Sequence, residues 1–155
     1  MRNMEFDKID RKILALLQAD GRKSNAELAL NVSLSPSACL RRVQQLELSG
    51  VIAGYVALVR QEAIGRPTSI FVEVALTSQS EEALNAFERA VQDCPDIMEC
   101  YLMSGDSDYL IRVVAADTQD YERIHKQHLT RLPGVARIRS SFALRAICKK
   151  TALDV

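Results

Sequence analysis

Residues 36–49 have the composition of a helix with one polar, basic face. A helical wheel gathers on that face Ser37, Ala38, Arg41 and Gln45, with Arg42 and Gln44 at its edges. Arginine can donate two hydrogen bonds to a guanine edge, glutamine can pair with adenine, and small side chains let a backbone approach the DNA groove. These residue types favour contact with DNA, although a plain solvated helix face can have a similar composition.

Ser35 stands directly before this segment, and Pro36 opens it. A serine there caps a helix, and proline is tolerated at the first helical position because that N–H makes no intrahelical bond. The hydroxyl and the free N–H groups of the first turn also suit a phosphate. The candidate DNA-binding residues are therefore Ser35, Ser37, Ala38, Arg41, Arg42 and Gln45.

A second group of chemically capable residues lies in the turn-rich run Ser-Gly-Asp-Ser-Asp at 104–108. It offers the unhindered N–H of Gly105 and the carboxylates of Asp106 and Asp108. A zwitterionic ligand needs N–H donors or a cation for its carboxylate and acceptors for its ammonium group. The run could supply part of such a site, but in many turns each Asp only caps its own backbone. The residues alone leave both interpretations open.

Constellations that would indicate an enzyme are missing from the sequence. There is no Ser/His/Asp set and no phosphate-binding loop, and the two histidines, His125 and His128, fall on one expected helix. The four cysteines form no CxxC pair and are expected to be buried free thiols of a reducing compartment. We expect a protein that is not an enzyme and holds no metal or cofactor.

The charges of the 155-residue chain balance, with 20 Lys and Arg against 20 Asp and Glu. Residues 1–62 carry a net charge of +2, and the remainder carries −2. One weakly basic head would neutralise few phosphates, so DNA affinity must come from several heads acting together. No apolar run approaches the roughly 20 residues of a membrane helix, and the first ten residues lack a signal-peptide core. We expect a cytoplasmic, nucleoid-associated protein without membrane contact.

Three helices are expected before residue 50. Asp7 caps the first, and Gly21 is expected to end it in a left-handed conformation. Ser24 and Glu27 form a capping box for a short second helix, and Gly50 ends the third. Two helices joined by a short turn, behind a packing helix, have the layout of a helix-turn-helix. A plain three-helix bundle is the alternative.

The stretch 51–59 has strand composition and would be a short wing hairpin or a strand that leaves the domain. The following residues, 60–67, are the most loop-like part of the chain. We therefore expect a winged helix-turn-helix domain at 1–59, a linker at 60–67 and a second domain at 68–155.

The second half alternates between strand and helix patterns in the order β-α-β-β-α-β. Strands are expected at 68–77, 97–103, 109–115 and 135–147, and the helices are capped by Ser80 and by Asp117 or Thr118. This order predicts an α+β, ferredoxin-like domain in which helices cover one face of an antiparallel sheet. Phe71 and Phe142 are expected to leave the other face partly apolar, which predicts a homo-oligomer built sheet to sheet.

The chain resembles the leucine-responsive regulatory protein (Lrp)/AsnC family, the feast/famine regulators of bacteria and archaea. The resemblance spans both halves and rests on four motifs: FDKIDRKIL at 6–14, LSPSACLRRVQQLELSGVIAGY at 34–55, SGDSDYLIRV at 104–113 and LPGVARIRSSFAL at 132–144. It implies a DNA-binding domain followed by a ferredoxin-like "regulation of amino-acid metabolism" (RAM) domain. It also implies dimers that assemble into octamers and a free amino acid as effector.

The resemblance favours the interpretation that the run around 104–108 binds an effector. It implies ligand contact at Met103, Ser104, Gly105, Asp106, Asp108 and Tyr109, with Ser140 and Phe142 on the last strand as neighbours. The predicted function is a sequence-specific, double-stranded-DNA-binding transcriptional regulator of amino-acid metabolism. A leucine-like or methionine-like amino acid would control its oligomerisation and DNA affinity. The alternative is an amino-acid-sensing regulatory subunit of a metabolic enzyme that does not bind DNA.

Overall fold

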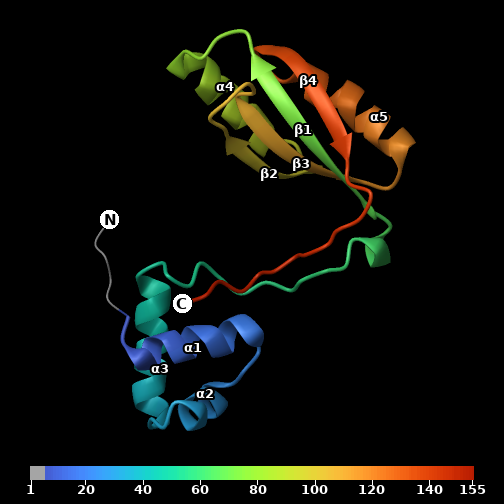
Figure 1. The fold of residues 1–155 in the computed structure, drawn as a ribbon. Helices are drawn as coiled ribbons and strands as arrows, with labels where there is room; N and C mark the ends of the chain where they lie inside the picture. The colour runs from blue at the N-terminus through green and yellow to red at the C-terminus, as the bar shows by residue number, and fades with distance from the viewer. Residues whose placement is uncertain (1–5) are drawn as a thin grey trace. The chain divides into compact units, whose positions relative to one another are not determined.

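A computed structural model describes residues 6–155, which form two compact units (Figure 1). A helical unit comprises the chain up to Leu58 together with Ile147–Val155, and a sheet unit comprises Val59–Ala146. The first five residues of the expected domain 1–59 lie outside the described part of the chain. Within residues 6–155, no helix is long and apolar enough to cross a membrane, and no cluster of His, Cys, Asp or Glu could hold a metal.

Three capped helices build the helical unit: α1 (Lys8–Ala19), α2 (Asn25–Asn31) and α3 (Pro36–Leu48). The Asp7 carboxylate accepts hydrogen bonds from the first turn of α1, and Ser24 with Glu27 forms the complete capping box of α2. The Ser35 hydroxyl caps α3. The helices share a core made of Ile13, Leu14, Leu28, Ala29, Val32, Cys39, Val43 and Leu46. All three predicted helices are confirmed.

Two expectations for this half are wrong. Helix α1 ends at Ala19, and the next residue, Asp20, has an extended backbone. Gly21 is not left-handed, whereas Gly50 after α3 is, at φ 76°. The strand or wing expected at 51–59 is not formed, and Val56, Leu58 and Val59 are exposed. Strand composition favours an extended backbone, but a strand also needs a hydrogen-bonded partner, and the four-stranded sheet of the described chain does not include this stretch.

The C-terminal tail, 147–155, makes its contacts within the helical unit, although the second domain was expected to include it. The Gln18 side chain accepts a hydrogen bond from the Leu153 N–H at 2.7 Å and donates one to the Leu153 carbonyl at 3.0 Å. In the same tail Cys148 is exposed, so the expectation of buried thiols is wrong there, whereas Cys39 and Cys94 are buried.

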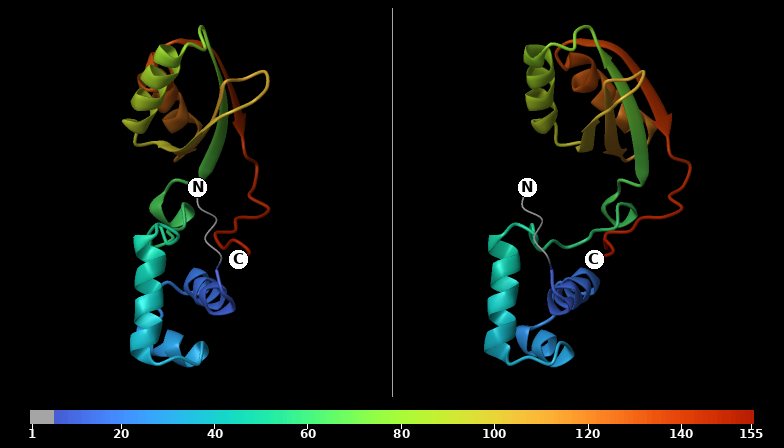
Figure 2. Two further views of the ribbon diagram at one scale, coloured as in Figure 1. Left: turned by 90° about the vertical axis from the view of Figure 1, so that its left-hand side faces the viewer. Right: turned by 60° about the vertical axis from the view of Figure 1, so that its left-hand side comes forward.

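The sheet unit has the expected β-α-β-β-α-β order. Its elements are β1 (Thr68–Leu76), α4 (Glu81–Gln92), β2 (Ile97–Leu102), β3 (Tyr109–Ala115), α5 (Thr118–Gln127) and β4 (Val135–Phe142). The strands pair antiparallel in the order β2-β3-β1-β4, and both helices lie on the same face of the sheet (Figure 2). This is the ferredoxin-like arrangement of the sequence prediction, with the last strand ending at Phe142 rather than near residue 147.

Alternation along the strands separates the covered face from the open face. Ile70, Val72 and Val74 of β1 are fully buried beneath the helices, while Phe71 and Glu73 between them are exposed. The covered face forms one core with Phe87 and Val91 of α4 and with Tyr121 and Ile124 of α5. The expected partly apolar open face is present at Phe71.

A buried carboxylate fastens the end of the expected linker to the sheet unit. Asp96, before β2, is 3% exposed, and its side chain lies 2.5 Å from Arg66 Nη1 and 3.6 Å from Arg123 Nη2. A buried carboxylate is tolerated when cations and hydrogen bonds compensate its lost hydration. The two arginines supply that compensation, and they hold residue 66 against the loop before β2.

Candidate functional site

The exposed face of α3 carries the side chains expected to contact DNA. Ser37, Arg41 and Gln45 are exposed, and Ala38 is half-buried. Within residues 6–155, Arg41 has no hydrogen-bond or ion-pair partner, so its donors are free for a ligand. A basic side chain between small and amide side chains matches what reading a major groove requires.

Local contacts fix α3 relative to α2. The Asn25 side chain donates a 2.8 Å hydrogen bond to the Pro36 carbonyl and so ties the start of α2 to the start of α3. Ser33, between the helices, has a left-handed backbone at φ 56°. The Ser35 hydroxyl accepts from the Ala38 N–H at 3.3 Å and lies 3.2 Å from the Ser37 hydroxyl. These contacts give the two helices the tight turn of a helix-turn-helix.

Arg42 differs from its neighbour Arg41 because it is paired. Its Nη1 lies 2.8 Å from Asp7 Oδ2 and 2.8 Å from Asp10 Oδ1, which joins α3 to α1. The Asp10 N–H, and then the Arg42 guanidinium, lower the pKa of Asp7. These contacts give Arg42 a structural role that the helical wheel could not reveal, and its DNA contact stays a prediction.

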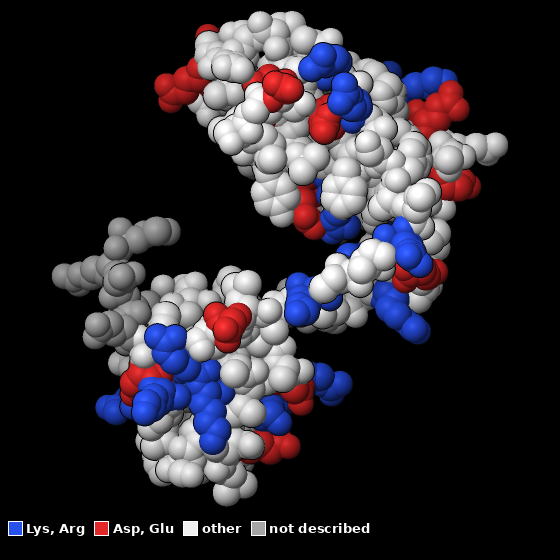
Figure 3. Space-filling model, viewed as in Figure 1, with Lys and Arg blue, Asp and Glu red and all other residues white. Residues whose placement is uncertain are grey.

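Basic side chains gather on one side of the helical unit, over α1 and the adjoining part of α3 (Figure 3). The exposed basic residues of α1 are Lys8, Arg11 and Lys12. A local concentration of positive charge of this kind attracts a polyanion even when the net charge of the chain is zero.

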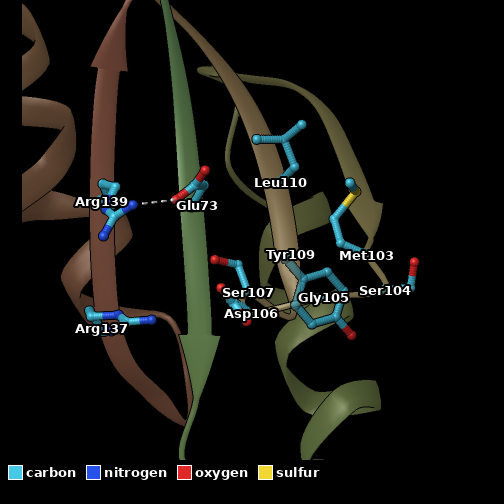
Figure 4. Close-up of a pocket in the computed structure, with 10 residues that line it drawn as sticks. All are labelled: Glu73, Met103, Ser104, Gly105, Asp106, Ser107, Tyr109, Leu110, Arg137 and Arg139. Carbon is cyan, nitrogen blue, oxygen red and sulfur yellow. Dashed lines mark ion pairs between the residues drawn. The ribbon is translucent and has the colours of Figure 1, made fainter.

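A cavity of about 590 Å³ opens at one end of the sheet unit (Figure 4). It is lined by Glu73, Met103, Ser104, Gly105, Asp106, Ser107, Tyr109, Leu110, Arg137 and Arg139. The lining combines two cations, two carboxylates and apolar side chains. Such a set can bind a small molecule that carries both charges and an apolar group.

The loop between β2 and β3 has a defined conformation. The Met103 N–H donates to the Asp108 carbonyl at 2.8 Å and closes the loop, and the Asp108 N–H donates to the Val74 carbonyl at 2.9 Å. Gly105 has φ 139°, a backbone conformation that side-chain-bearing residues rarely adopt. These hydrogen bonds hold the two ends of the loop together and against β1, beside the cavity that the loop lines.

The two loop carboxylates, which the sequence could not tell apart, have different surroundings. Asp108 Oδ2 accepts from the Leu76 N–H at 2.7 Å, and Oδ1 accepts from Gln79 Nε2 at 2.6 Å. Asp106 is exposed, lines the cavity and has no partner within the described chain. Asp108 therefore anchors the loop to the end of β1, whereas Asp106 is available to a ligand.

Ser140 and Phe142, the expected neighbours on the last strand, do not line this cavity. The Ser140 hydroxyl lies 2.5 Å from the Tyr121 hydroxyl, and the Phe142 ring stacks edge-on against the Tyr121 ring at 5.2 Å. Both side chains therefore lie on the face covered by α5, because alternate residues of a strand point to opposite faces. The expectation that Phe142 contributes to the open face is accordingly wrong.

Tyr109 lines the cavity, but its hydroxyl is used elsewhere. It donates to Glu88 of α4 at 2.9 Å, and the ring packs on Phe87 with centroids 4.4 Å apart. Burial, followed by the bond to Glu88, raises the pKa of Tyr109. Tyr109 is 1% exposed, and its hydroxyl is therefore not available to a ligand in the cavity.

Glu73, Arg137 and Arg139 line the cavity and were missed by the sequence reasoning. Their signal was available in the alternation of β1 and β4, since odd-numbered positions of both strands point to the open face. The register that places β4 beside β1 was the missing information.

The chain matches known proteins in both units. Residues 6–47 match the AsnC-type helix-turn-helix domain, and residues 69–153 match the Lrp/AsnC ligand-binding domain. It is 43% identical over 148 residues to the Bkd operon transcriptional regulator of Pseudomonas aeruginosa, covering 96% of this chain and 97% of that one. It is 40% identical over 151 residues to the leucine-responsive regulatory protein of Escherichia coli K12, covering 97% and 92%.

Solved structures with the same fold include a transcriptional regulator of Neisseria meningitidis in complex with L-Met, with a TM-score of 0.90 and 35% identity over 96% of each chain. An AsnC-family regulator of Agrobacterium tumefaciens gives a TM-score of 0.90 and 38% identity, also over 96% of each chain. The fold and the matches define a DNA-binding transcriptional regulator with a separate ligand-binding domain. The chain belongs to the Lrp/AsnC family.

The different surroundings of the two loop carboxylates predict different effects of their removal. Asp108→Ala leaves the Leu76 N–H without its acceptor, so we expect the free energy of unfolding to fall by about 1–3 kcal/mol. Asp106→Ala removes an exposed side chain without a partner and is expected to change it by less than about 0.5 kcal/mol. Urea unfolding without added ligand measures both. Equal stability of the two variants would contradict the anchoring role of Asp108.

Proposed function

We propose that this protein regulates genes of amino-acid metabolism by binding specific double-stranded DNA sites through α3, and that a free amino acid controls its assembly and DNA affinity. The observation that carries the DNA-binding surface is the free, exposed guanidinium of Arg41 between Ser37 and Gln45. Arg41 and Gln45 would contact base edges, and Ser35, Ser37, Ala38 and Arg42 would lie at the backbone or beside it.

Charge reversal at Arg41 tests this surface. Arg41→Glu places a carboxylate where the phosphates and base edges would lie, so we expect promoter affinity to fall by at least about tenfold. Fluorescence anisotropy with promoter DNA over a series of salt concentrations measures the affinity and its salt dependence. Lys126→Glu is the matched control, because it makes the same charge change at an exposed position of α5 in the sheet unit. The proposal fails if Arg41→Glu binds the promoter as tightly as wild type.

The effector site would be the cavity at the loop 103–108. Its combination of cations, carboxylates and the apolar side chains of Met103 and Leu110 supports a zwitterion with an apolar side chain. The L-Met complex of the Neisseria relative supports the same class of ligand. We propose a leucine-like or methionine-like amino acid. Of the predicted contacts, Met103, Ser104, Gly105, Asp106 and Tyr109 line the cavity, whereas Asp108, Ser140 and Phe142 would act only indirectly.

A thermal-shift screen of the twenty amino acids tests the effector class. A ligand that binds only the folded protein adds about 2.7 kcal/mol of stability at a concentration of 100 times its Kd, so its addition raises the unfolding midpoint. We expect the largest shifts from L-leucine or L-methionine and none from the corresponding D-amino acids, which serve as controls. If no amino acid shifts the midpoint, the protein does not respond to free amino acids.

We further propose that the chain forms dimers through the open face of the sheet and that these assemble into octamers. Phe71 on β1 and Tyr101 on β2 are 40% and 53% exposed, although both are large aromatic residues. Apolar side chains exposed together on one sheet face are usually covered by a partner. An oligomer would also combine several weakly basic helical units on one DNA molecule.

The open-face interface is tested by Phe71→Glu. Introducing a carboxylate onto an apolar contact should split the assembly into smaller species, which multi-angle light scattering would detect. The new side chain can approach Arg112, its cross-strand neighbour, so the subunit should stay folded. Leu30→Glu on α2 serves as the control, because Leu30 is 80% exposed in the helical unit. An unchanged mass for Phe71→Glu would exclude the open face as the interface.

A further inference from the structure

We infer that Arg137 and Asp106 fix the orientation of the effector in the cavity, with the Arg137 guanidinium on the α-carboxylate and the Asp106 carboxylate on the α-ammonium group. This inference rests on the proposed function, in which a free amino acid occupies the cavity. It specifies which end of the bound amino acid faces Arg137 and which faces Asp106, and therefore which analogues the site should bind weakly.

Arg137 differs from the other arginines of the open face because no carboxylate of the described residues pairs with it. Arg112 lies 2.7 Å from Glu99, and Arg139 lies 3.7 Å from Glu73. Arg137 faces Ala75 across the β1–β4 pair, and its guanidinium has no partner among the described residues. It is an exposed residue that lines the cavity. Its paired donors therefore remain available for a carboxylate, which a guanidinium binds in a two-pronged manner.

Asp106 is the matching acceptor. The Asp108 carboxylate is occupied by the Leu76 N–H and the Gln79 amide, and Glu73 lies beside Arg139, whereas Asp106 is unpaired. Figure 4 shows the Arg137 guanidinium directed from β4 towards the part of the cavity where Asp106 and Ser107 lie. Among the described residues, the cavity lining thus contains one unpaired cation, on β4, and one unpaired anion, in the loop between β2 and β3.

Apolar groups complete the site. Met103 and Leu110 line the cavity on the side of β2 and β3, and Met103 is 44% exposed. An amino acid held by its two charges would place its side chain against these residues. The site should therefore discriminate by head group: an ester or an amine lacks the charge that Arg137 binds, and a 2-oxo acid lacks the one that Asp106 binds.

Isothermal titration calorimetry of the full chain tests the role of Arg137. The probe is L-leucine or L-methionine, whichever gives the larger thermal shift, together with its methyl ester. Arg137→Gln should weaken binding of the amino acid at least tenfold while changing the affinity for the ester less than twofold. Arg137→Lys should recover part of the lost affinity. Arg145→Gln, which removes an exposed arginine beyond β4, should bind both probes like wild type.

The complementary experiment tests Asp106. Asp106→Asn should weaken binding of the amino acid at least tenfold and leave the affinity for the 2-oxo acid, 4-methyl-2-oxopentanoate for L-leucine, within twofold of wild type. A variant that lost affinity for the amino acid and its analogue equally would be damaged in some other way, and that result overturns the orientation.

The outcomes separate this inference from the function on which it rests. If wild type binds the amino acid and Arg137→Gln binds it equally well, the assigned orientation is overturned while the amino-acid response stands. If no amino acid binds wild type, the proposed effector class fails and the orientation fails with it. Selective loss for the amino acid, with the ester and the 2-oxo acid unaffected in their respective variants, supports both.

Discussion

The architecture of the sheet unit depends on one constraint: its helices cover only one face of the sheet. Two crossover helices, α4 and α5, lie on the same side, so alternate residues of the central strand β1, namely Ile70, Val72 and Val74, are apolar and buried. The residues between them are released from that requirement. The open face can therefore hold the charged lining of a cavity at one end and the exposed aromatic side chain of Phe71.

A second principle connects the two sites: the position of nearby carboxylates decides which arginines are left for ligands. On α3, Arg42 is bound by Asp7 and Asp10, and Arg41 is unpaired. On β4, Arg139 lies near Glu73, and Arg137 is unpaired. In each pair, one arginine lies beside a carboxylate, and the other has no partner within the described residues. A paired guanidinium would have to lose its carboxylate before binding an anionic ligand at full strength.

Because the subunit has no net positive charge, the proposed assembly would strengthen DNA binding. The chain has no net charge, but basic side chains gather over α1 on one side of the helical unit. A single unit would bind DNA weakly, whereas linked units multiply the effect of each contact. A ligand that favours one assembly state over another would then change DNA affinity without touching the DNA-binding surface.

Local signals in the sequence determined most of the elements, because caps and periodicity depend on neighbouring residues. Asp7, Ser24, Ser35 and Ser80 each begin the helix expected of them, and the order of strands and helices in the second half is as predicted. The motifs also indicated the family correctly. Where an element depended on a distant partner, local signals were insufficient: residues 51–59 have strand composition but no strand partner within the described chain.

In the cavity, too, local sequence signals predicted some features and the tertiary structure decided others. The sequence located the loop around 104–108, since its turn residues and carboxylates are adjacent in the chain. Only the tertiary structure decided that Asp108 is occupied by the end of β1, that Ser140 and Phe142 face Tyr121, and that Arg137 lines the cavity. Each of these depends on the register that brings β4 and the loop against β1, and register is set by pairing between residues far apart in sequence.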